Sequence, residues 1–254
     1  MNVNTAAPYD TVADVYDLVS ASYQHDRWIE ALLERCKAHG QRPNSVLDVA
    51  CGSGHSFLPM LARGLAVTAC DISPGMVDIA RRRAAGRCEV HVADMRHLPL
   101  LGAFDLVTCL DDAINHLETP TDIGDALRGM RDNLGPGGLV VFDALLLGAY
   151  AGGHDHVFER DDSFVVWRKR ESDVRVPGDA TQIVVDIFRR DGESWSRDRF
   201  VQPHRHYPIE ELVALAGDAG LQLVQVYGQR SGGVLDDSVD ESRDHKAVLI
   251  LAAR

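Results

Sequence analysis

Short runs of β-branched and aliphatic residues alternate along the chain with segments in which apolar residues recur every three to four positions. The first pattern indicates buried β-strands and the second indicates amphipathic helices. Their alternation is typical of an α/β fold, in which helices cover both faces of a mostly parallel sheet. The apolar runs predict strands over Ser45–Ala50, Ala66–Asp71, Glu89–Ala93, Phe104–Leu110 and Leu139–Asp143.

Helices are predicted before the first strand and between the strands. The second helix carries Trp28, Leu32 and Cys36 at helical spacing, and it stops before Gly40 and Pro43. The predicted helices cover Tyr9–Ser20, Gln24–His39, Ser53–Arg63, Pro74–Ala85 and Thr121–Asn133.

After Asp143 the pattern changes to alternation at period two, with turn residues between the runs, which predicts an antiparallel insertion after the fifth strand. A helix and two strands then restore the α/β pattern. The insertion runs are Val157–Phe158, Phe164–Arg170, Gln182–Arg190 and Trp195–Tyr207, and the closing elements are Ile209–Ala219, Leu221–Tyr227 and Lys246–Ala252.

These segments predict one domain over residues 1–254. Its parts are an N-terminal helical lid (1–40), a ligand-binding core (41–143), an antiparallel insertion on the substrate side (144–207) and the C-terminal part of the core (208–254).

Composition narrows the partners of this domain. The 26 lysines and arginines are outnumbered by 38 aspartates and glutamates, which gives a net charge of −12. General binding to nucleic acid requires clustered positive charge, so we expect a small-molecule partner and no nucleic acid. The five cysteines are odd in number and form no C-x-x-C pair, so we expect reduced cysteines in a cytoplasmic protein. Neither a signal peptide nor a membrane span is predicted.

The most informative segment runs from Val46 to Gly54, where a strand leads directly into a glycine turn and then a helix. The glycines permit positive φ angles and a close approach of a ligand to the backbone, and the helix start offers unpaired N–H groups. Asp71 ends the next predicted strand and Asp94 follows the third. Ligands of open α/β sheets bind at these strand ends, so one ligand is expected to span the three segments.

Three residues indicate which kind of ligand binds there. A dinucleotide site would have a third glycine where this chain has Phe57. The carboxylate of Asp48 would repel a pyrophosphate and attract a cationic group, and that of Asp71 suits a ribose diol. S-adenosylmethionine has both a cationic group and a ribose diol.

With these motifs, VLDVACGSG, VTACDISPGM, VADM, FDLVTCL and LGPGGLVVFD, the chain resembles the class I S-adenosylmethionine-dependent methyltransferases over nearly its whole length. The resemblance implies a Rossmann-like fold. It also implies that Asp48 and the Ala50–Gly54 backbone hold the methionine end, Asp71 the ribose, and Asp94 with Met95 the adenine. The implied cofactor contacts are Tyr16, Tyr23, Trp28, Asp48, Ala50, Cys51, Gly52, Gly54, Asp71, Ile72, Met76, Asp94, Met95 and Leu110.

The segment CLDDAINHL after the fourth strand bears on the acceptor. It lacks the Asn-Pro-Pro-aromatic run of enzymes that methylate DNA bases or protein glutamine. It resembles the small-molecule branch that includes glycine N-methyltransferases and the amino-sugar N,N-dimethyltransferases of bacterial natural-product pathways. That branch implies that Tyr16 and His116 face the reacting atom, with His116 as a general base. Asp111 and Asp112 depart from the small uncharged residues of the branch, which leaves the nucleophile open as nitrogen or oxygen.

Further acceptor contacts are expected in this segment and in the insertion. The candidates are Asp111, Asp112, Asn115, Trp167, Arg168, His204 and His206. No metal is expected, because His154-Asp155-His156 and His204-x-His206 lack the spacing of familiar catalytic metal sites.

Two other functions remain open from the sequence. One is a regulatory protein that binds the cofactor without turnover. The other is a methyltransferase acting on peptide or protein N-termini, whose basic substrate could meet the acidic loop Asp236–Asp244. The oligomeric state is also open, with a homodimer among the options.

Overall fold

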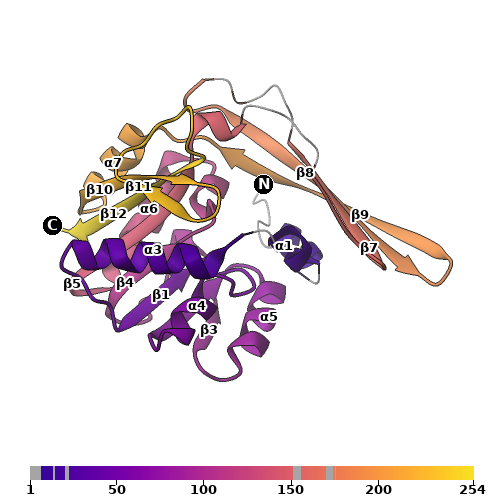
Figure 1. The fold of residues 1–254 in the computed structure, drawn as a ribbon, viewed down its shortest axis with the longest axis horizontal. Helices are drawn as coiled ribbons and strands as arrows, with labels where there is room; N and C mark the ends of the chain where they lie inside the picture. The colour runs from indigo at the N-terminus through magenta and orange to yellow at the C-terminus, as the bar shows by residue number, and fades with distance from the viewer. Residues whose placement is uncertain (1–6, 14, 21–22, 151–155, 170–173, 175) are drawn as a thin grey trace.

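The computed structural model describes residues 7–13, 15–20, 23–150, 156–169, 174 and 176–254. It consists of an eight-stranded sheet with helices on both faces and a second, four-stranded sheet that projects from one side as an arm (Figure 1). This confirms the predicted α/β fold with an antiparallel insertion.

The central sheet is parallel over five strands and antiparallel at one end. The parallel strands are β1 (Ser45–Val49), β2 (Ala66–Asp71), β3 (Glu89–Val92), β4 (Phe104–Cys109) and β5 (Leu134–Leu145). The antiparallel strands are β10 (Leu221–Arg230), β11 (Val234–Asp236) and β12 (Lys246–Ala253). The order is β11-β10-β12-β5-β4-β1-β2-β3, so the parallel strands β1 and β4 lie at the point where the strand order reverses, which is where open α/β sheets bind ligands.

Alternating side chains of the strands bury against helices on opposite faces. Val46 and Leu106 pack with one group of helices, whereas Leu47 and Val107 pack with the other. The first group is α3 (His25–Ala38), α4 (Phe57–Ala62) and α5 (Pro74–Ala84), and the second is α6 (Pro120–Asp132) and α7 (Ile209–Asp218). These two cores fix the strand ends that form the site.

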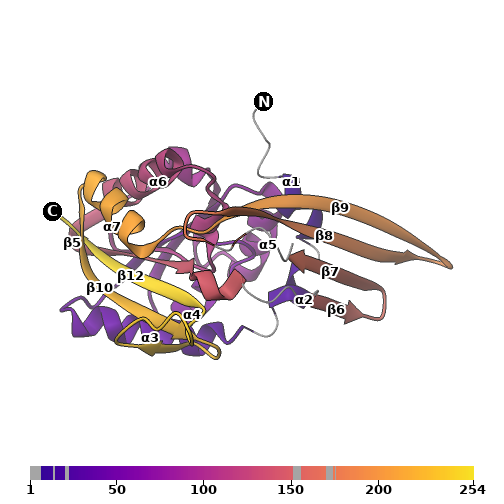
Figure 2. The same ribbon diagram turned by 90° about the horizontal axis from the view of Figure 1, so that it is seen from above.

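The arm consists of β6 (His156–Arg160), β7 (Ser163–Lys169), β8 (Ala180–Asp191) and β9 (Ser194–Arg205), all antiparallel. The short helices α1 (Ala7–Val12) and α2 (Tyr16–Ser20) form a third apolar core with its inner face. Figure 2 shows α1 between the arm and α5, so the N-terminal segment joins the arm to the central sheet.

Many elements differ from their predicted bounds at one or both ends, and β5, for example, starts at Leu134 instead of Leu139. Three further differences follow. The helix predicted over Tyr9–Ser20 is divided in two around Val12–Val15, because Val12, Ala13 and Val15 bury their side chains against the arm. The helix predicted from Ser53 begins at Phe57, since Ser56 turns its hydroxyl toward Asp48. Strand β11 lies in the loop that was predicted between the last two strands.

Three 3-10 helices complete the described part of the fold: η1 (Met95–His97), η2 (Ala113–His116) and η3 (Leu147–Tyr150).

Among the described residues, no helix combines the length and the apolar character needed to cross a membrane.

Candidate active site

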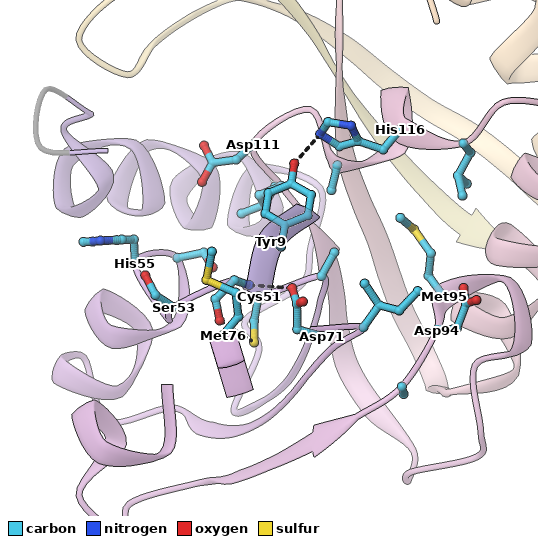
Figure 3. Close-up of a pocket in the computed structure, with 18 of the residues that line it drawn as sticks. Tyr9, Cys51, Ser53, His55, Asp71, Met76, Asp94, Met95, Asp111 and His116 are labelled. Atoms are coloured by element: carbon cyan, nitrogen blue, oxygen red, sulfur yellow. Dashed lines mark hydrogen bonds between the residues drawn. The ribbon is translucent and has the colours of Figure 1, made fainter. Parts of the chain in front are cut away.

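A pocket opens where β1, β2 and β4 end, beneath α1 and α2 (Figure 3). Its lining extends from the glycine turn after β1 to the start of η1 and to η2. Twelve of the predicted site residues line it: Tyr16, Ala50, Cys51, Gly52, Asp71, Ile72, Met76, Asp94, Met95, Leu110, Asp111 and His116.

The turn after β1 brings backbone into the pocket. Ala50 has φ +56° and Gly52 has φ +52°, in the left-handed region that side chains disfavour. Gly54, with φ +98°, lies outside the lining, and a Cβ there would lie 2.7 Å from the Phe57 ring. The strained turn thus exposes main chain to a ligand, as the glycine pattern predicts.

Asp71 at the end of β2 faces the pocket with both carboxylate oxygens already ordered. Gly52 donates its N–H to Oδ2 at 2.8 Å, and Ser73 donates its N–H to Oδ1 at 2.9 Å. Burial raises the pKa of Asp71 above its ordinary value, although these two donors act against the shift. The side chain is therefore fixed at the position expected for ribose recognition.

Asp48 lies beneath the pocket, outside its lining. Ser56 donates its hydroxyl to Oδ2 at 2.5 Å, and Thr108 donates to Oδ1 at 2.7 Å. Burial raises the pKa of Asp48 to about 6. Both carboxylate oxygens of Asp48 therefore accept hydrogen bonds inside the protein instead of contacting the methionine end directly, as the resemblance implied. These bonds link β1 to β4 and to the segment after the glycine turn.

Asp94 lines the far end of the pocket and starts η1. Its Oδ1 accepts the Arg96 backbone N–H at 2.9 Å, and its Oδ2 accepts from the Arg96 guanidinium at 2.6 Å. Burial acts to raise the pKa of Asp94, but the bonds from Arg96 hold it below its ordinary value. A carboxylate and a guanidinium thus meet at this end of the pocket.

The N-terminal helices cover the pocket through specific polar contacts. Oδ1 of Asp10 on α1 accepts the Ser73 hydroxyl at 2.5 Å and the Gly75 N–H at 2.8 Å, at the start of α5. Tyr9 and Tyr16 both line the pocket, with their ring centroids 6.4 Å apart. The N-terminal helices therefore cover the pocket.

His116, from η2, lines the pocket opposite Asp71. Its Nδ1 lies 3.1 Å from the Pro203 carbonyl, which can only accept, so Nδ1 carries the proton. Its Nε2 is therefore the acceptor of the Tyr9 hydroxyl at 2.7 Å. Burial, and then the nearby His204, lower the pKa of His116 to about 4. The imidazole is neutral at pH 7, and its basic nitrogen is bound by Tyr9, which makes it a weaker base than the sequence predicts.

The turn between β4 and η2 has two consecutive aspartates in the left-handed conformation. Asp111 has φ +62° and Asp112 has φ +52°. His25 Nε2 lies 2.8 Å from Asp111, and Lys246 Nζ lies 2.7 Å from Asp112 and 2.8 Å from Asp143. These ion pairs hold the strained turn that places His116.

Several predicted residues are located outside the pocket lining. Tyr23 and Trp28 face the ammonium of Lys246, with their ring centroids 6.0 and 5.5 Å from Nζ. Asn115 is completely buried, where it donates to the Arg205 carbonyl at 2.7 Å and accepts the Leu145 N–H at 3.0 Å. The backbone groups that Asn115 satisfies make it a structural link between η2, β5 and β9.

The acceptor contacts predicted in the insertion are also outside the lining. Trp167 packs in the core between the arm and α1, and Arg168 pairs with Asp186 at 2.8 Å. His206 Nδ1 accepts the Gly178 N–H at 3.3 Å. His204 and Asp112 lie directly behind His116, with the rings of the two histidines 4.6 Å apart. Residues His154 and Asp155 lie outside the described part of the chain, and His156 is exposed on β6.

Sequence reasoning missed other lining residues, chiefly Tyr9, His25, Ser53, His55, Ser56, Arg96, Glu118 and Asp122. Tyr9 is the first residue of the predicted N-terminal helix and belongs to no recognisable motif. His25 and His55 stack with centroids 5.3 Å apart although they are far apart in sequence. Only the three-dimensional approach of α3 to the glycine turn brings them together.

Comparisons with known proteins show which protein family the sequence is similar to. Residues 46–138 match the methyltransferase domain family. The putative methyltransferase YqeM of Bacillus subtilis is 25% identical over 228 residues, 86% of this chain and 88% of that protein. The dTDP-4-amino-2,3,4,6-tetradeoxy-D-glucose N,N-dimethyltransferase of Saccharopolyspora spinosa is 31% identical over 133 residues. This match covers 52% of the chain and 53% of that enzyme, about half of each.

The fold has a counterpart among solved structures. An S-adenosylmethionine-dependent methyltransferase from Clostridium acetobutylicum superimposes with a TM-score of 0.79 at 21% identity, covering 96% of this chain and 98% of that one. The methyltransferase domain match and the related enzymes bear out the predicted class I S-adenosylmethionine-dependent methyltransferase and its cofactor, S-adenosylmethionine, and the solved structure bears out the fold.

Proposed function

We propose that this methyltransferase transfers the methyl group of S-adenosylmethionine to the amino nitrogen of a small metabolite of the amino-sugar type. The observation that carries the proposal is one continuous pocket with Asp71 and Asp94 at one side and the Tyr9–His116 pair at the other. Similarity to a sugar N,N-dimethyltransferase over half of the chain supports nitrogen as the acceptor atom.

We assign successive residues along the pocket to successive parts of the cofactor. Asp71 accepts the ribose hydroxyls, and Asp94 with the Met95 backbone binds the adenine. The main chain of Ala50–Gly52 contacts the methionine part, whereas Asp48 supports that turn from below through Ser56. A cofactor held in this way would leave the side of the pocket lined by Tyr9 and His116 for the acceptor.

Methyl transfer is an in-line displacement at the sulfonium carbon, and correct positioning supplies much of its acceleration. An amine in its free-base form already has the lone pair that attacks, so no proton needs to be removed before the carbon–nitrogen bond forms. The Tyr9 hydroxyl, held by Nε2 of His116, offers an oxygen lone pair to an N–H of the acceptor. We therefore assign Tyr9 and His116 to positioning the acceptor.

A panel of acceptors with S-adenosylmethionine and mass-spectrometric detection tests the proposal. It contains an amino sugar in free and nucleotide-activated form, the matching sugar with hydroxyl in place of the amine, glycine and a basic peptide. We expect one or two methyl additions on the amino sugar alone. Methylation of the hydroxy sugar would replace nitrogen by oxygen, and methylation of the peptide would favour the N-terminal alternative. Cofactor binding without any methylated product would favour a regulatory protein.

A further inference from the structure

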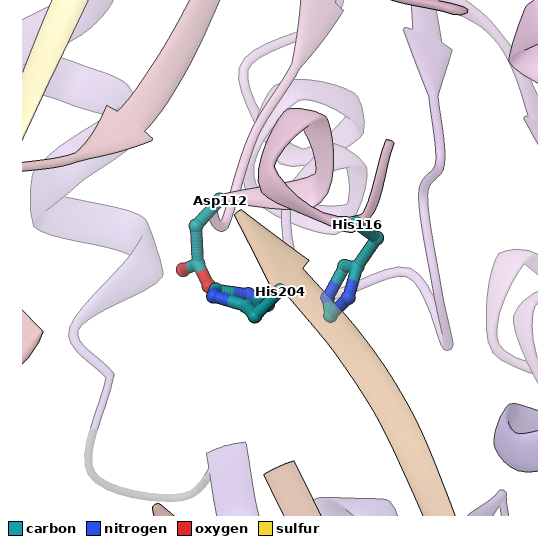
Figure 4. Close-up of side chains that lie close together, drawn as sticks. All are labelled: Asp112, His116 and His204. Carbon is teal, nitrogen blue, oxygen red and sulfur yellow. The ribbon is translucent and has the colours of Figure 1, made fainter. Parts of the chain in front are cut away.

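Three potential metal ligands converge behind the pocket from separate parts of the chain. Asp112 follows β4, His116 ends η2 and His204 lies near the end of β9 (Figure 4). One donor atom of each lies within 4.8 Å of the other two. His204 is only 2% exposed, so its ring is held inside the protein.

Each of the three side chains is held from behind by another group. His116 donates its Nδ1–H to the Pro203 carbonyl at 3.1 Å. His204 Nδ1 lies 3.2 Å from the Tyr150 hydroxyl. Oδ1 of Asp112 lies 2.7 Å from the Lys246 ammonium. Metal-binding histidines typically use one ring nitrogen for such a supporting bond and the other for the ion.

Two of the three side chains approach each other without forming a short hydrogen bond. His204 Nε2 lies 3.5 Å from Oδ2 of Asp112, which is beyond a good hydrogen bond. The Nε2 atom of His116 carries a lone pair, which is bound by the Tyr9 hydroxyl. These atoms form a three-ligand arrangement with room for a shared ion after small side-chain rotations.

The local charge also favours a cation. Three carboxylates surround the single ammonium of Lys246, at 3.9 Å for Asp111, 2.7 Å for Asp112 and 2.8 Å for Asp143. Asp111 is also paired with His25 Nε2 at 2.8 Å, so the excess of negative charge falls on Asp112 and Asp143, which share the Lys246 ammonium, and uncompensated buried charge is costly. A divalent ion beside Asp112 would reduce the imbalance.

We propose that Asp112, His116 and His204 bind one divalent transition-metal ion of the Zn²⁺ type. Two imidazoles and one carboxylate suit such an ion better than Mg²⁺ or Ca²⁺, which prefer oxygen ligands. Three protein ligands leave a coordination position open, as in catalytic rather than structural zinc sites.

The open position faces the pocket, because His116 lines it. A role for the ion in holding a polar group of the acceptor rests on the proposed function, whereas metal binding itself does not. The sequence predicts no metal, because His204 lies 88 positions after His116 and the His204-x-His206 spacing is not that of a familiar catalytic metal site.

Calorimetric titration of the chelator-treated full chain with Zn²⁺ alone tests the site, with Mg²⁺ as comparison. We expect one Zn²⁺ per chain, little Mg²⁺ binding, and a loss of Zn²⁺ affinity of about 100-fold or more in His204→Ala and in Asp112→Asn. The matched control is His206→Ala, which removes a buried histidine two positions away and should keep wild-type affinity. If circular dichroism shows that His204→Ala is unfolded, His204→Gln takes its place.

Absence of Zn²⁺ binding to the folded wild type would overturn the site, as would equal losses in the ligand variants and in His206→Ala. Neither S-adenosylmethionine nor an acceptor is present in the titration, so its failure leaves the methyl transfer proposal untouched. In the activity assay, loading with Zn²⁺ should lower the acceptor KM without changing cofactor affinity. An unchanged KM with bound Zn²⁺ would overturn the role given to the ion.

Discussion

The hydroxyl of Tyr9 lies 2.7 Å from Nε2 of His116, although 107 positions separate the two residues in the chain. Tyr9 belongs to α1 and His116 to η2, so this bond connects the N-terminal cover to the turn after β4. The Pro203 carbonyl keeps the proton on Nδ1 of His116, so Nε2 accepts the hydrogen bond from Tyr9. The acceptor side of the pocket is therefore complete only when α1 is docked.

Replacing Tyr9 by Phe tests this relationship. The ring and its packing against Tyr16 remain, but the hydroxyl that meets His116 is lost. We expect the acceptor kcat/KM to fall about 10-fold, the effect of one lost hydrogen bond of ordinary strength, with cofactor affinity unchanged. Steady-state kinetics with varied acceptor measures it. Wild-type kcat/KM in the folded variant would remove the hydroxyl from the site.

His116→Ala distinguishes positioning from general-base catalysis. As a positioning residue, His116 should affect chiefly the acceptor KM, and raising the pH should not restore the rate. A general base would instead contribute about 10²–10⁴-fold to kcat. A kcat loss of that size with unchanged KM would contradict the positioning role and return His116 to the base predicted from the sequence.

Asp71→Ala tests the cofactor assignment. Charge-assisted hydrogen bonds to both ribose hydroxyls would be lost, and S-adenosylmethionine binding should weaken by about 1.5–3 kcal/mol. The control is Asp78→Ala, which removes an exposed carboxylate on α5. Calorimetry that shows equal affinities for wild type and Asp71→Ala would exclude Asp71 from ribose binding.

Asp10→Ala tests the N-terminal cover. Oδ1 of Asp10 accepts from Ser73 and Gly75 at the start of α5, so its loss should loosen α1. We expect limited proteolysis of the N-terminal segment to be faster in the variant, and S-adenosylhomocysteine to slow cleavage in the wild type. Identical cleavage rates with and without the product would indicate a cover that stays docked regardless of ligand.

Asp48→Asn tests the buried carboxylate beneath the glycine turn. Burial raises its folded pKa to about 6 from 3.8, so between these pH values the native state binds more protons than the unfolded state. Stability from this group therefore rises as the pH falls through about 6, and ionisation above that pH costs on the order of 3 kcal/mol.

The variant lacks this titration. We expect the unfolding free energy of Asp48→Asn, relative to wild type, to be highest at pH 7 and to decline toward pH 4. Urea unfolding at several pH values measures this difference. A difference that does not change with pH would show that the folded Asp48 has an ordinary pKa.

The fold could be predicted largely because its strands carry strong local signals. Ala66–Asp71 has the same bounds in the prediction and in the structure. The division of the N-terminal helix could not be predicted, because burial of Val12 and Val15 depends on an arm more than 140 positions away. Local periodicity contains no information about such a partner.

In the candidate site, too, some residues could be predicted from local sequence patterns and others could not. Asp71, Asp94 and the glycine turn line the pocket as predicted, since each follows a strand whose end the fold places there. Tyr9 and the approach of His204 to His116 were missed, because α1 and β9 reach the site only through tertiary packing. Strand ends are visible in a sequence, whereas contacts between distant elements are not.

Formation of S-adenosylhomocysteine in the presence and absence of an amino sugar tests the central claim most directly. We predict that S-adenosylhomocysteine forms only when the amino sugar is present. The amount of S-adenosylhomocysteine formed should equal the number of methyl groups that appear on the nitrogen of the amino sugar. S-adenosylmethionine that binds in the pocket but yields no S-adenosylhomocysteine with any amine, or a methyl group recovered only on protein, would contradict the account.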